Sequence, residues 1–207
     1  MNGIIGKKIG MTSAFASDGR LVPVTVVQVG PCVVTQVKTQ EKDGYTALQL
    51  GFDETSPEKL NKPISGHLKK ATDKGYRVLR EFHIESVENF EPGAVVDLDI
   101  FSIGDKVTVT GTTKGRGFQG TIKRHGFSRG PETHGNRNHR KPGSIGNSAW
   151  PAKVIRGKRM PGHMGVEKET VKNLTVVDIK HKDNLLLLKG AIPGPKTGIL
   201  KIYKTNK

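Results

Sequence analysis

The sequence predicts a mainly β protein in which short antiparallel strands form a small barrel with a modest α+β lobe. Three observations support this fold class and the organisation of the chain. Short runs rich in β-branched residues recur through the first hundred residues and again after residue 170, and Gly or Pro turns close them. The third observation is a middle segment, residues 111–165, that lacks this pattern. We therefore expect one domain of 207 residues, with a scaffold of residues 1–110 and 166–207 and the middle segment inserted within it.

The expected strands end at turn residues or alternate apolar with polar side chains. The run at residues 21–29 stops at Gly30 and Pro31, and Asp43–Gly44 marks a tight turn before the next run. The strands expected in this way are residues 21–29, 33–37, 46–52, 95–101, 106–110, 171–179, 184–189 and 198–203. Helices are expected at residues 57–60 and 65–72, with a less regular acidic piece at 84–89. Strands from both ends of the chain should close the sheet.

Charge is concentrated in one part of the chain. The protein has 34 Lys and Arg against 19 Asp and Glu, a net charge of +15. Residues 1–110 are nearly neutral, with 13 basic and 14 acidic side chains, and residues 166–207 have nine Lys and four acids. The middle segment has 12 basic side chains, and Glu132 is its single acid. A positive surface of this density attracts polyanions such as nucleic acid.

Several classes of protein are excluded by composition. Cys32 is the single cysteine, so neither a disulfide framework nor a four-cysteine metal site can form. The sequence has no apolar run of signal-peptide or membrane-spanning length, and Leu185–Leu188 is far too short. We expect a soluble intracellular protein with no membrane partner. Cys32 itself follows a Gly-Pro turn at the start of an apolar run, where a small buried side chain is expected.

The middle segment is too polar to fold by itself. It has 12 of the 26 Gly and four of the seven His, but only 11 apolar residues. Burial of so few apolar side chains cannot offset the conformational entropy of ordering the whole segment. We therefore expect it to be mobile in the free protein and to become ordered on a partner. A solvated basic loop is the alternative, but solubility does not require Gly and Arg at this density.

The residue types of the middle segment match the chemistry of folded RNA. Glycine lets the backbone approach a crowded surface, and Arg binds phosphate through two parallel bonds and stacks on bases. His125, His139 and Trp150 add flat rings for stacking. The residues predicted to bind RNA are Lys114, Arg116, Lys123, Arg124, His125, Arg129, Arg137, His139, Arg140, Lys141, Trp150, Lys153, Arg156, Lys158, Arg159 and His163.

Lys7 and Lys8 form a smaller basic feature between Gly6 and Ile9. Two interpretations are open: an exposed turn between strands, or secondary contacts to RNA phosphates.

Matches to catalytic and cofactor motifs in the chain are weak. Gly115-x-Gly117-x-x-Gly120 fits a dinucleotide fingerprint literally, but an apolar helix and a later acidic residue do not follow. The histidines of the middle segment have no cysteine and a single carboxylate beside them, and its cations would oppose a divalent ion. No Ser, His and Asp grouping stands out. We therefore expect no catalytic residue, metal, cofactor or small-molecule substrate.

These residues resemble a known family along essentially the whole chain. The matching passages include Gly3–Thr12 (GIIGKKIGMT), Pro23–Val34 (PVTVVQVGPCVV), Thr110–Arg124 (TGTTKGRGFQGTIKR) and Val154–Gly165 (VIRGKRMPGHMG). Asp43–Phe52, His139–Gly146 and Asn184–Pro195 match as well. The chain is similar to the bacterial-type ribosomal protein three family of the large subunit.

The resemblance implies more than composition can. Family members have a six-stranded closed barrel of the translation-protein type and a long extension that enters ribosomal RNA and approaches the peptidyl-transferase centre. They are not enzymes; they bind large-subunit rRNA beside neighbouring large-subunit proteins, nucleate assembly early and act in the cytoplasm. The resemblance places the deepest loop near residues 144–153. Thr108 departs from the usual Asp or Asn, and Ala149 has no amide where some relatives have a methylated glutamine.

Two other functions remain as alternatives. An enzyme with a barrel and a basic substrate loop would contain a bound nucleotide or flavin after purification. A general DNA-compacting protein would bind duplex DNA and structured RNA about equally.

Overall fold

The structure is a computed structural model that describes residues 3–16, 18–85 and 90–205. Strands dominate it and the helices are short, so the predicted mainly β fold is confirmed. The chain divides into two compact units. One is formed by Met1–Thr112 with Lys168–Lys207, which we call the scaffold, and the other by Thr113–Glu167, which we call the basic segment.

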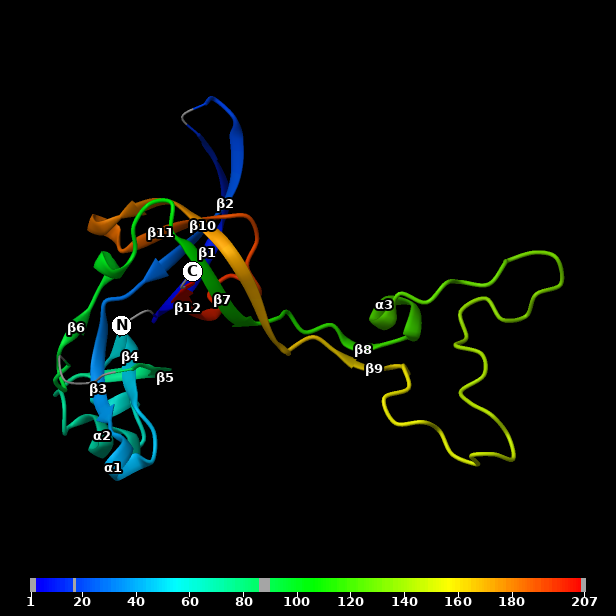
Figure 1. Ribbon diagram of the computed structural model, residues 1–207, viewed down its shortest axis with the longest axis horizontal. Helices are drawn as coiled ribbons and strands as arrows, with labels where there is room; N and C mark the ends of the chain where they lie inside the picture. Colours follow the sequence, from blue (N-terminus) through cyan, green and yellow to red (C-terminus); the bar gives the residue numbers. More distant parts are fainter. Residues whose placement is uncertain (1–2, 17, 86–89, 206–207) are drawn as a thin grey trace. The chain divides into compact units, whose positions relative to one another are not determined.

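Six antiparallel strands of the scaffold pair in a ring (Figure 1). In the order of pairing they are β1 (Gly3–Phe15), β12 (Ile199–Lys204), β7 (Lys106–Thr112), β10 (Lys168–Lys180), β11 (Leu185–Lys189) and β2 (Leu21–Val29). The last of these, β2, pairs back with β1, so the sheet forms a closed barrel. The first and last strands of the chain are neighbours in this ring. The basic segment connects Thr112 of β7 to Lys168 of β10, and these two residues are themselves paired.

A second antiparallel sheet and most of the helices complete the scaffold. Its strands, in order, are β5 (Gly75–His83), β4 (Ala47–Thr55), β3 (Cys32–Lys38) and β6 (Val95–Val96). The helices of the scaffold are α1 (Gln40–Asp43), η1 (Pro57–Lys59), α2 (Lys62–Leu68), η2 (Leu98–Ile100) and η3 (His181–Asp183). This part corresponds to the expected α+β lobe.

One hydrophobic core joins the barrel to the second sheet. Fully buried side chains come from both, including Ile5 of β1, Leu50 of β4 and Phe82 of β5. The ring of Phe82 lies against Tyr203 of β12, with 5.2 Å between the ring centroids. A Cβ atom at Gly3 would come within 2.5 Å of the Phe82 ring, so the close approach of β1 to this ring requires glycine.

Seven of the expected strands are confirmed, and their ends shift by no more than three residues. The strand expected at 95–101 is wrong beyond Val96, because the chain turns there into η2. Leu98 and Phe101 are both buried and lie three positions apart, which is the spacing of a 3₁₀ turn rather than of a strand. The helix expected at 57–60 is confirmed as η1. The helix expected at 65–72 is present as α2, but it begins three residues earlier and ends four residues earlier than expected. The piece expected at 84–89 falls largely on residues 86–89, outside the described residues.

The basic segment has little regular structure. Two short strands, β8 (Gly117–Gln119) and β9 (Gly162–Met164), pair antiparallel, and a single short helix, α3 (Thr121–His125), follows β8. Residues 126–159 between α3 and β9 contain no helix or strand. That the segment becomes ordered on a partner stays a prediction.

Candidate nucleic-acid interface

The base of the basic segment is a narrow two-stranded stem. The amide of Thr113 donates to the carbonyl of Glu167, and the amide of Arg116 to that of Met164, each at 2.9 Å. Gly165 has a φ of +82°, and a Cβ atom there would collide with the carbonyl oxygen of Lys114. Glycine is therefore required where the two chains of the stem approach most closely.

Two neighbouring side chains, Arg124 and His125, contact the same carbonyl oxygen, that of Met160. Nη1 of Arg124 donates to the Met160 carbonyl at 2.8 Å, and Nε2 of His125 lies 3.0 Å from the same oxygen. Both side chains come from α3, which Gly126 ends with a φ of +71°. We call this group the clasp. It brings the two ends of residues 126–159 together, so these residues form a closed loop.

A smaller closed turn lies within that loop. The amide of Gly130 donates to the carbonyl of His139 at 3.1 Å. The carbonyl of Pro131 accepts from Nδ2 of Asn136 at 2.9 Å and lies 3.0 Å from Nδ1 of His139. These bonds satisfy short polar side chains locally and leave the guanidinium of Arg137 exposed on the turn.

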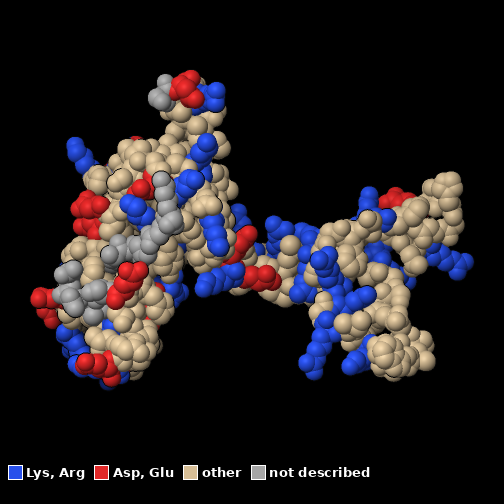
Figure 2. All heavy atoms as spheres, in the orientation of Figure 1, with Lys and Arg blue, Asp and Glu red and all other residues tan. Residues whose placement is uncertain are grey.

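The cations of the basic segment are exposed and have few acidic neighbours. The segment has 12 Lys and Arg side chains, and its acids are Glu132 and Glu167. Arg129 and Glu132 form an exposed ion pair with 3.5 Å between Nη1 and Oε1. Figure 2 shows many Lys and Arg side chains spread over this segment, with few acidic side chains among them. Exposed cations at this density are the electrostatic footprint of a nucleic-acid-binding surface.

The predicted RNA-binding residues are almost all accessible. Each of the sixteen has an exposed side chain except Arg124 and His125, which are half-buried in the clasp. Trp150 is 85% exposed, whereas tryptophan side chains of folded proteins are on average largely buried. A partner molecule could cover this ring.

One aromatic residue of this surface, Phe118, was not predicted from the sequence as a binding residue. Phe118 is 75% exposed and lies directly opposite His163 across the β8–β9 pair. Two flat, exposed rings on neighbouring strands form a platform on which bases can stack. The alternation in Gly117–Gln119 was too short to reveal which way Phe118 points.

The prediction for Lys8 needs correction. Lys8 lies within β1, its exposed fraction is 9%, and its Nζ donates to the carbonyls of Ile192 at 2.8 Å and Gly194 at 3.0 Å. An ammonium group held in this way cannot reach an external phosphate. The alternative of an exposed turn is also wrong, because β1 continues from Gly3 to Phe15. Lys7 is half-buried, and its contact with RNA stays a prediction.

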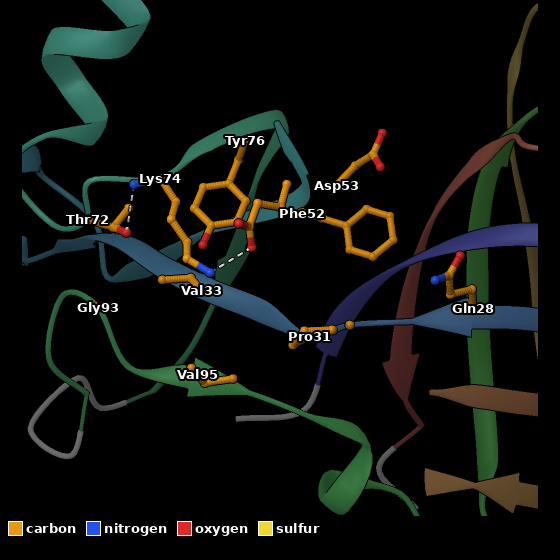
Figure 3. A pocket seen from close by; sticks show the side chains of 12 residues that line it. Gln28, Pro31, Val33, Phe52, Asp53, Thr72, Lys74, Tyr76, Gly93 and Val95 are labelled. Atoms are coloured by element: carbon orange, nitrogen blue, oxygen red, sulfur yellow. Dashed lines mark hydrogen bonds and ion pairs between the residues drawn. The ribbon is translucent and has the colours of Figure 1, made fainter. Parts of the chain in front are cut away.

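A cavity of about 580 Å³ in the scaffold is the other candidate site (Figure 3). Phe52, Tyr76 and Val33 line it, and Lys74 pairs with Glu54 at 3.0 Å beside them. The charged residues of its lining are Asp53, Glu54 and Lys74, so the cavity has no excess positive charge for an anionic cofactor. None of its lining residues belongs to the Gly115–Gly120 motif.

Two other kinds of feature are relevant to function in the described residues, namely metal-type clusters and membrane-spanning helices. In residues 3–16, 18–85 and 90–205, no three His, Cys, Asp or Glu side chains are grouped so that they could hold a metal ion. Over the same residues, the helices are too short or too polar to span a membrane. Cys32 is fully buried, as expected, and burial raises the pKa of its thiol to about 12.

Comparison with known proteins identifies the family. A family model described as ribosomal protein L3 matches residues 81–185. A large ribosomal subunit protein uL3 from Desulforapulum autotrophicum is 65% identical over 202 residues, which cover 98% of each chain. This chain belongs to the ribosomal protein L3 family. A uL3 protein of Syntrophobacter fumaroxidans is 50% identical over 99% of this chain, and one of Pelotomaculum thermopropionicum is 52% identical over 99%.

Membership of the ribosomal protein L3 family confirms the resemblance read from the sequence. The family consists of structural ribosomal proteins and not of enzymes, so the enzyme alternative is wrong. The relatives are covered almost end to end, and the match therefore includes both the scaffold and the basic segment.

Proposed function

We propose that this member of the ribosomal protein L3 family is a structural constituent of the cytoplasmic large ribosomal subunit and binds large-subunit rRNA through its basic segment. The observation that supports this most is the concentration of exposed cations in Thr113–Glu167, attached to a scaffold whose first 110 residues are nearly neutral. Phosphate contacts from Arg and Lys would supply affinity, and exposed rings would stack on unpaired bases.

Each part of the segment has a distinct role in this proposal. The exposed Lys and Arg side chains neutralise phosphates, and Trp150, with Phe118 and His163, stacks on bases. The clasp positions the loop rather than contacting RNA directly, because Arg124 and His125 are already bound to the Met160 carbonyl. Lys8 lies outside the interface.

The proposal extends to the place of the protein in the subunit. We propose that the barrel is of the translation-protein type, that the protein binds rRNA early and nucleates assembly beside neighbouring proteins, and that residues 144–153 approach the peptidyl-transferase centre. Support comes from the family resemblance, from the ring of six paired strands and from the exposure of Trp150.

Salt dependence of binding tests the interface. If about six to ten cations meet phosphates, the affinity of the full chain for large-subunit rRNA should fall by about 10³–10⁵-fold between 50 and 200 mM salt. Replacing Arg137, Arg140 and Lys141 by Gln should reduce the slope of log affinity against log salt by about three. The matched control replaces Lys172, Lys180 and Lys182, three exposed lysines of the scaffold, and should leave the slope nearly unchanged.

Deletion of residues 126–159 provides a second test. The clasp brings residues 125 and 160 together, so a short glycine linker can join them. We expect the scaffold to stay folded and most RNA affinity to disappear. Full affinity after the deletion would move the binding site to the scaffold, and equal affinity of the intact chain for duplex DNA would favour DNA compaction instead.

A further inference from the structure

The outer half of the β1–β2 hairpin extends beyond the pairings of the barrel (Figure 1). Strand β12 pairs with β1 only over Gly3–Lys7, and β11 pairs with β2 only from Val24 to Gln28. Within the described part of the chain, residues 9–15 and 21–23 therefore have only each other as strand partners. We call these residues the outer hairpin. A two-stranded hairpin without further packing is only marginally stable in water.

One face of the outer hairpin exposes large apolar side chains. Phe15 is paired with Leu21, and Ser13 with Pro23, in the register of the two strands. Because side chains alternate between faces, these four residues and Met11 share one face. Met11, Phe15 and Leu21 are 52%, 78% and 60% exposed. An apolar cluster of this kind on a projecting hairpin is typical of a contact surface.

The same part of β1 has an unpaired backbone edge. The amide of Ala16 donates to the carbonyl of Arg20 at 2.9 Å, which makes this a hydrogen-bonded pair of the ladder. Bonded and non-bonded pairs alternate along antiparallel strands. The N–H and C=O groups of Met11, Ser13 and Phe15 are therefore directed away from β2. The position of Pro23, which has no N–H, opposite Ser13 agrees with this alternation.

Charge indicates which kind of partner fits. Between residues 9 and 24 the charged side chains are Asp18 and Arg20, which pair with each other at 3.3 Å. The outer hairpin is thus neutral in a protein of net charge +15. A surface without free cations gains nothing from phosphates, whereas its apolar face and open edge match the side chains and backbone of an extended peptide.

We propose that the outer hairpin is a docking site for an extended, apolar segment of a different protein chain, which adds as a third strand along β1 and covers Met11, Phe15 and Leu21. The inference rests on the proposed function, because that partner is then one of the proteins of the large subunit. Strand addition would satisfy the open edge, and the apolar partner would remove an exposed patch that otherwise favours aggregation.

Site-specific photocrosslinking in assembled subunits tests the proposal. A benzophenone amino acid replaces Phe15 in the full chain, and a second chain has the same probe at Phe118, the exposed phenylalanine of the basic segment. In large subunits we expect the probe at position 15 to link to another protein and the probe at position 118 to link to RNA. RNA adducts at position 15, adducts to a second copy of this chain, or no protein adduct would each overturn the inference.

The outcome also separates the inference from the function on which it rests. If both chains enter large subunits and only position 15 fails to link to protein, the docking site is wrong and the proposed function stands. If neither chain enters large subunits, the proposed function fails and the inference fails with it.

Variants of the hairpin test the two kinds of contact separately. Phe15→Ser with Leu21→Ser should reduce incorporation into subunits by about tenfold or more at limiting protein, with unchanged melting of the barrel. Thr12→Ala, on the opposite face, is the matched control and should have no effect. Ser13→Pro removes one outward N–H and no β1–β2 bond, so a loss of about two- to tenfold is expected. Normal incorporation of the Phe15 and Leu21 variant would contradict the proposal.

Discussion

The ammonium group of Lys8 lies 2.8 Å from the carbonyl oxygen of Ile192, a residue 184 positions later in the chain. It also donates to the carbonyl of Gly194 at 3.0 Å. These bonds tie β1 to the loop between β11 and β12, next to the point where the amide of Thr197 donates to the Lys8 carbonyl at 2.7 Å. A lysine of a strongly basic protein thus stabilises the fold instead of binding a polyanion.

Replacing Lys8 by Met should destabilise the scaffold without weakening RNA binding by the folded protein. The methionine keeps the apolar stem but leaves the buried carbonyl of Ile192 and the half-buried carbonyl of Gly194 without this donor, and we expect a loss of about 2–4 kcal/mol in the free energy of unfolding. Urea denaturation measures it. Lys7→Met, at the half-buried neighbour, is the control and should cost much less. An equal loss in both variants would show that the carbonyl bonds are not the cause.

Replacing Arg124 by Ala should open the loop of the basic segment. The variant loses the 2.8 Å bond to the Met160 carbonyl, and His125 alone would hold the two ends together. We expect faster tryptic cleavage within residues 126–159 and several-fold weaker rRNA binding, with unchanged melting of the scaffold. Arg129→Ala, which removes only an exposed ion pair, should change cleavage between the remaining sites little. Identical cleavage rates in the two variants would contradict a role for the clasp.

The thiol of Cys32 should be unreactive in the folded protein. Burial raises its pKa from 9.0 to about 12, with a weak hydrogen bond from Sγ to the Ile5 carbonyl at 3.7 Å. Because the raised pKa favours the neutral thiol, its contribution to stability is complete below pH 9 and disappears as the pH approaches 12. Labelling with a disulfide reagent at pH 8 should be negligible in the native state and complete in urea. Rapid native labelling would contradict the burial.

Glu81 should stabilise the second sheet in a pH-dependent way. Burial raises the pKa of its carboxyl, but hydrogen bonds from Lys38 and Tyr45 outweigh burial and hold that pKa below its ordinary value. A lowered pKa contributes stability above the ordinary carboxyl range, and the contribution is lost as the pH falls through the folded value.

The Glu81→Gln variant tests this contribution. It should be less stable than the natural protein by up to about 1 kcal/mol at pH 7, and the difference should shrink as the pH falls below the ordinary carboxyl range and vanish below the lowered pKa of Glu81. Glu54→Gln, which removes an exposed pair with Lys74, should show a smaller difference. A difference for Glu81→Gln that is independent of pH would rule out the carboxylate as its source.

Much of the fold is visible in the sequence because apolar alternation marks the strands of the barrel. Besides the short strands β8 and β9 of the basic segment, two strands of the scaffold were not predicted, for identifiable reasons. In β1 the glycines at positions 3, 6 and 10 and an irregular register between Lys8 and Gly10 hide the alternation. In β5 charged residues at Arg77, Arg80 and Glu81 interrupt the apolar pattern. Both β1 and β5 form strands because they pair with other strands in the folded chain. A local sequence pattern does not show such pairing.

The candidate interface was predicted by composition, whereas its internal geometry was not. Cations, glycines and rings mark residues 111–165 directly, since they need only be present and exposed. The clasp joins Arg124 to a carbonyl 36 residues later, and the Phe118–His163 pair joins two strands of three residues each. Lys8 shows the reverse case, because a basic residue in a basic protein was buried by contacts that arise only in the folded chain.

Ultraviolet crosslinking in intact large subunits, with identification of the linked peptides and nucleotides, tests the central claim most directly. The account predicts that most RNA-linked peptides of this protein come from Thr113–Glu167, with Trp150 and the Phe118–His163 platform among the linked positions. RNA-linked peptides that come mainly from the scaffold, or none from residues 126–159, would contradict it.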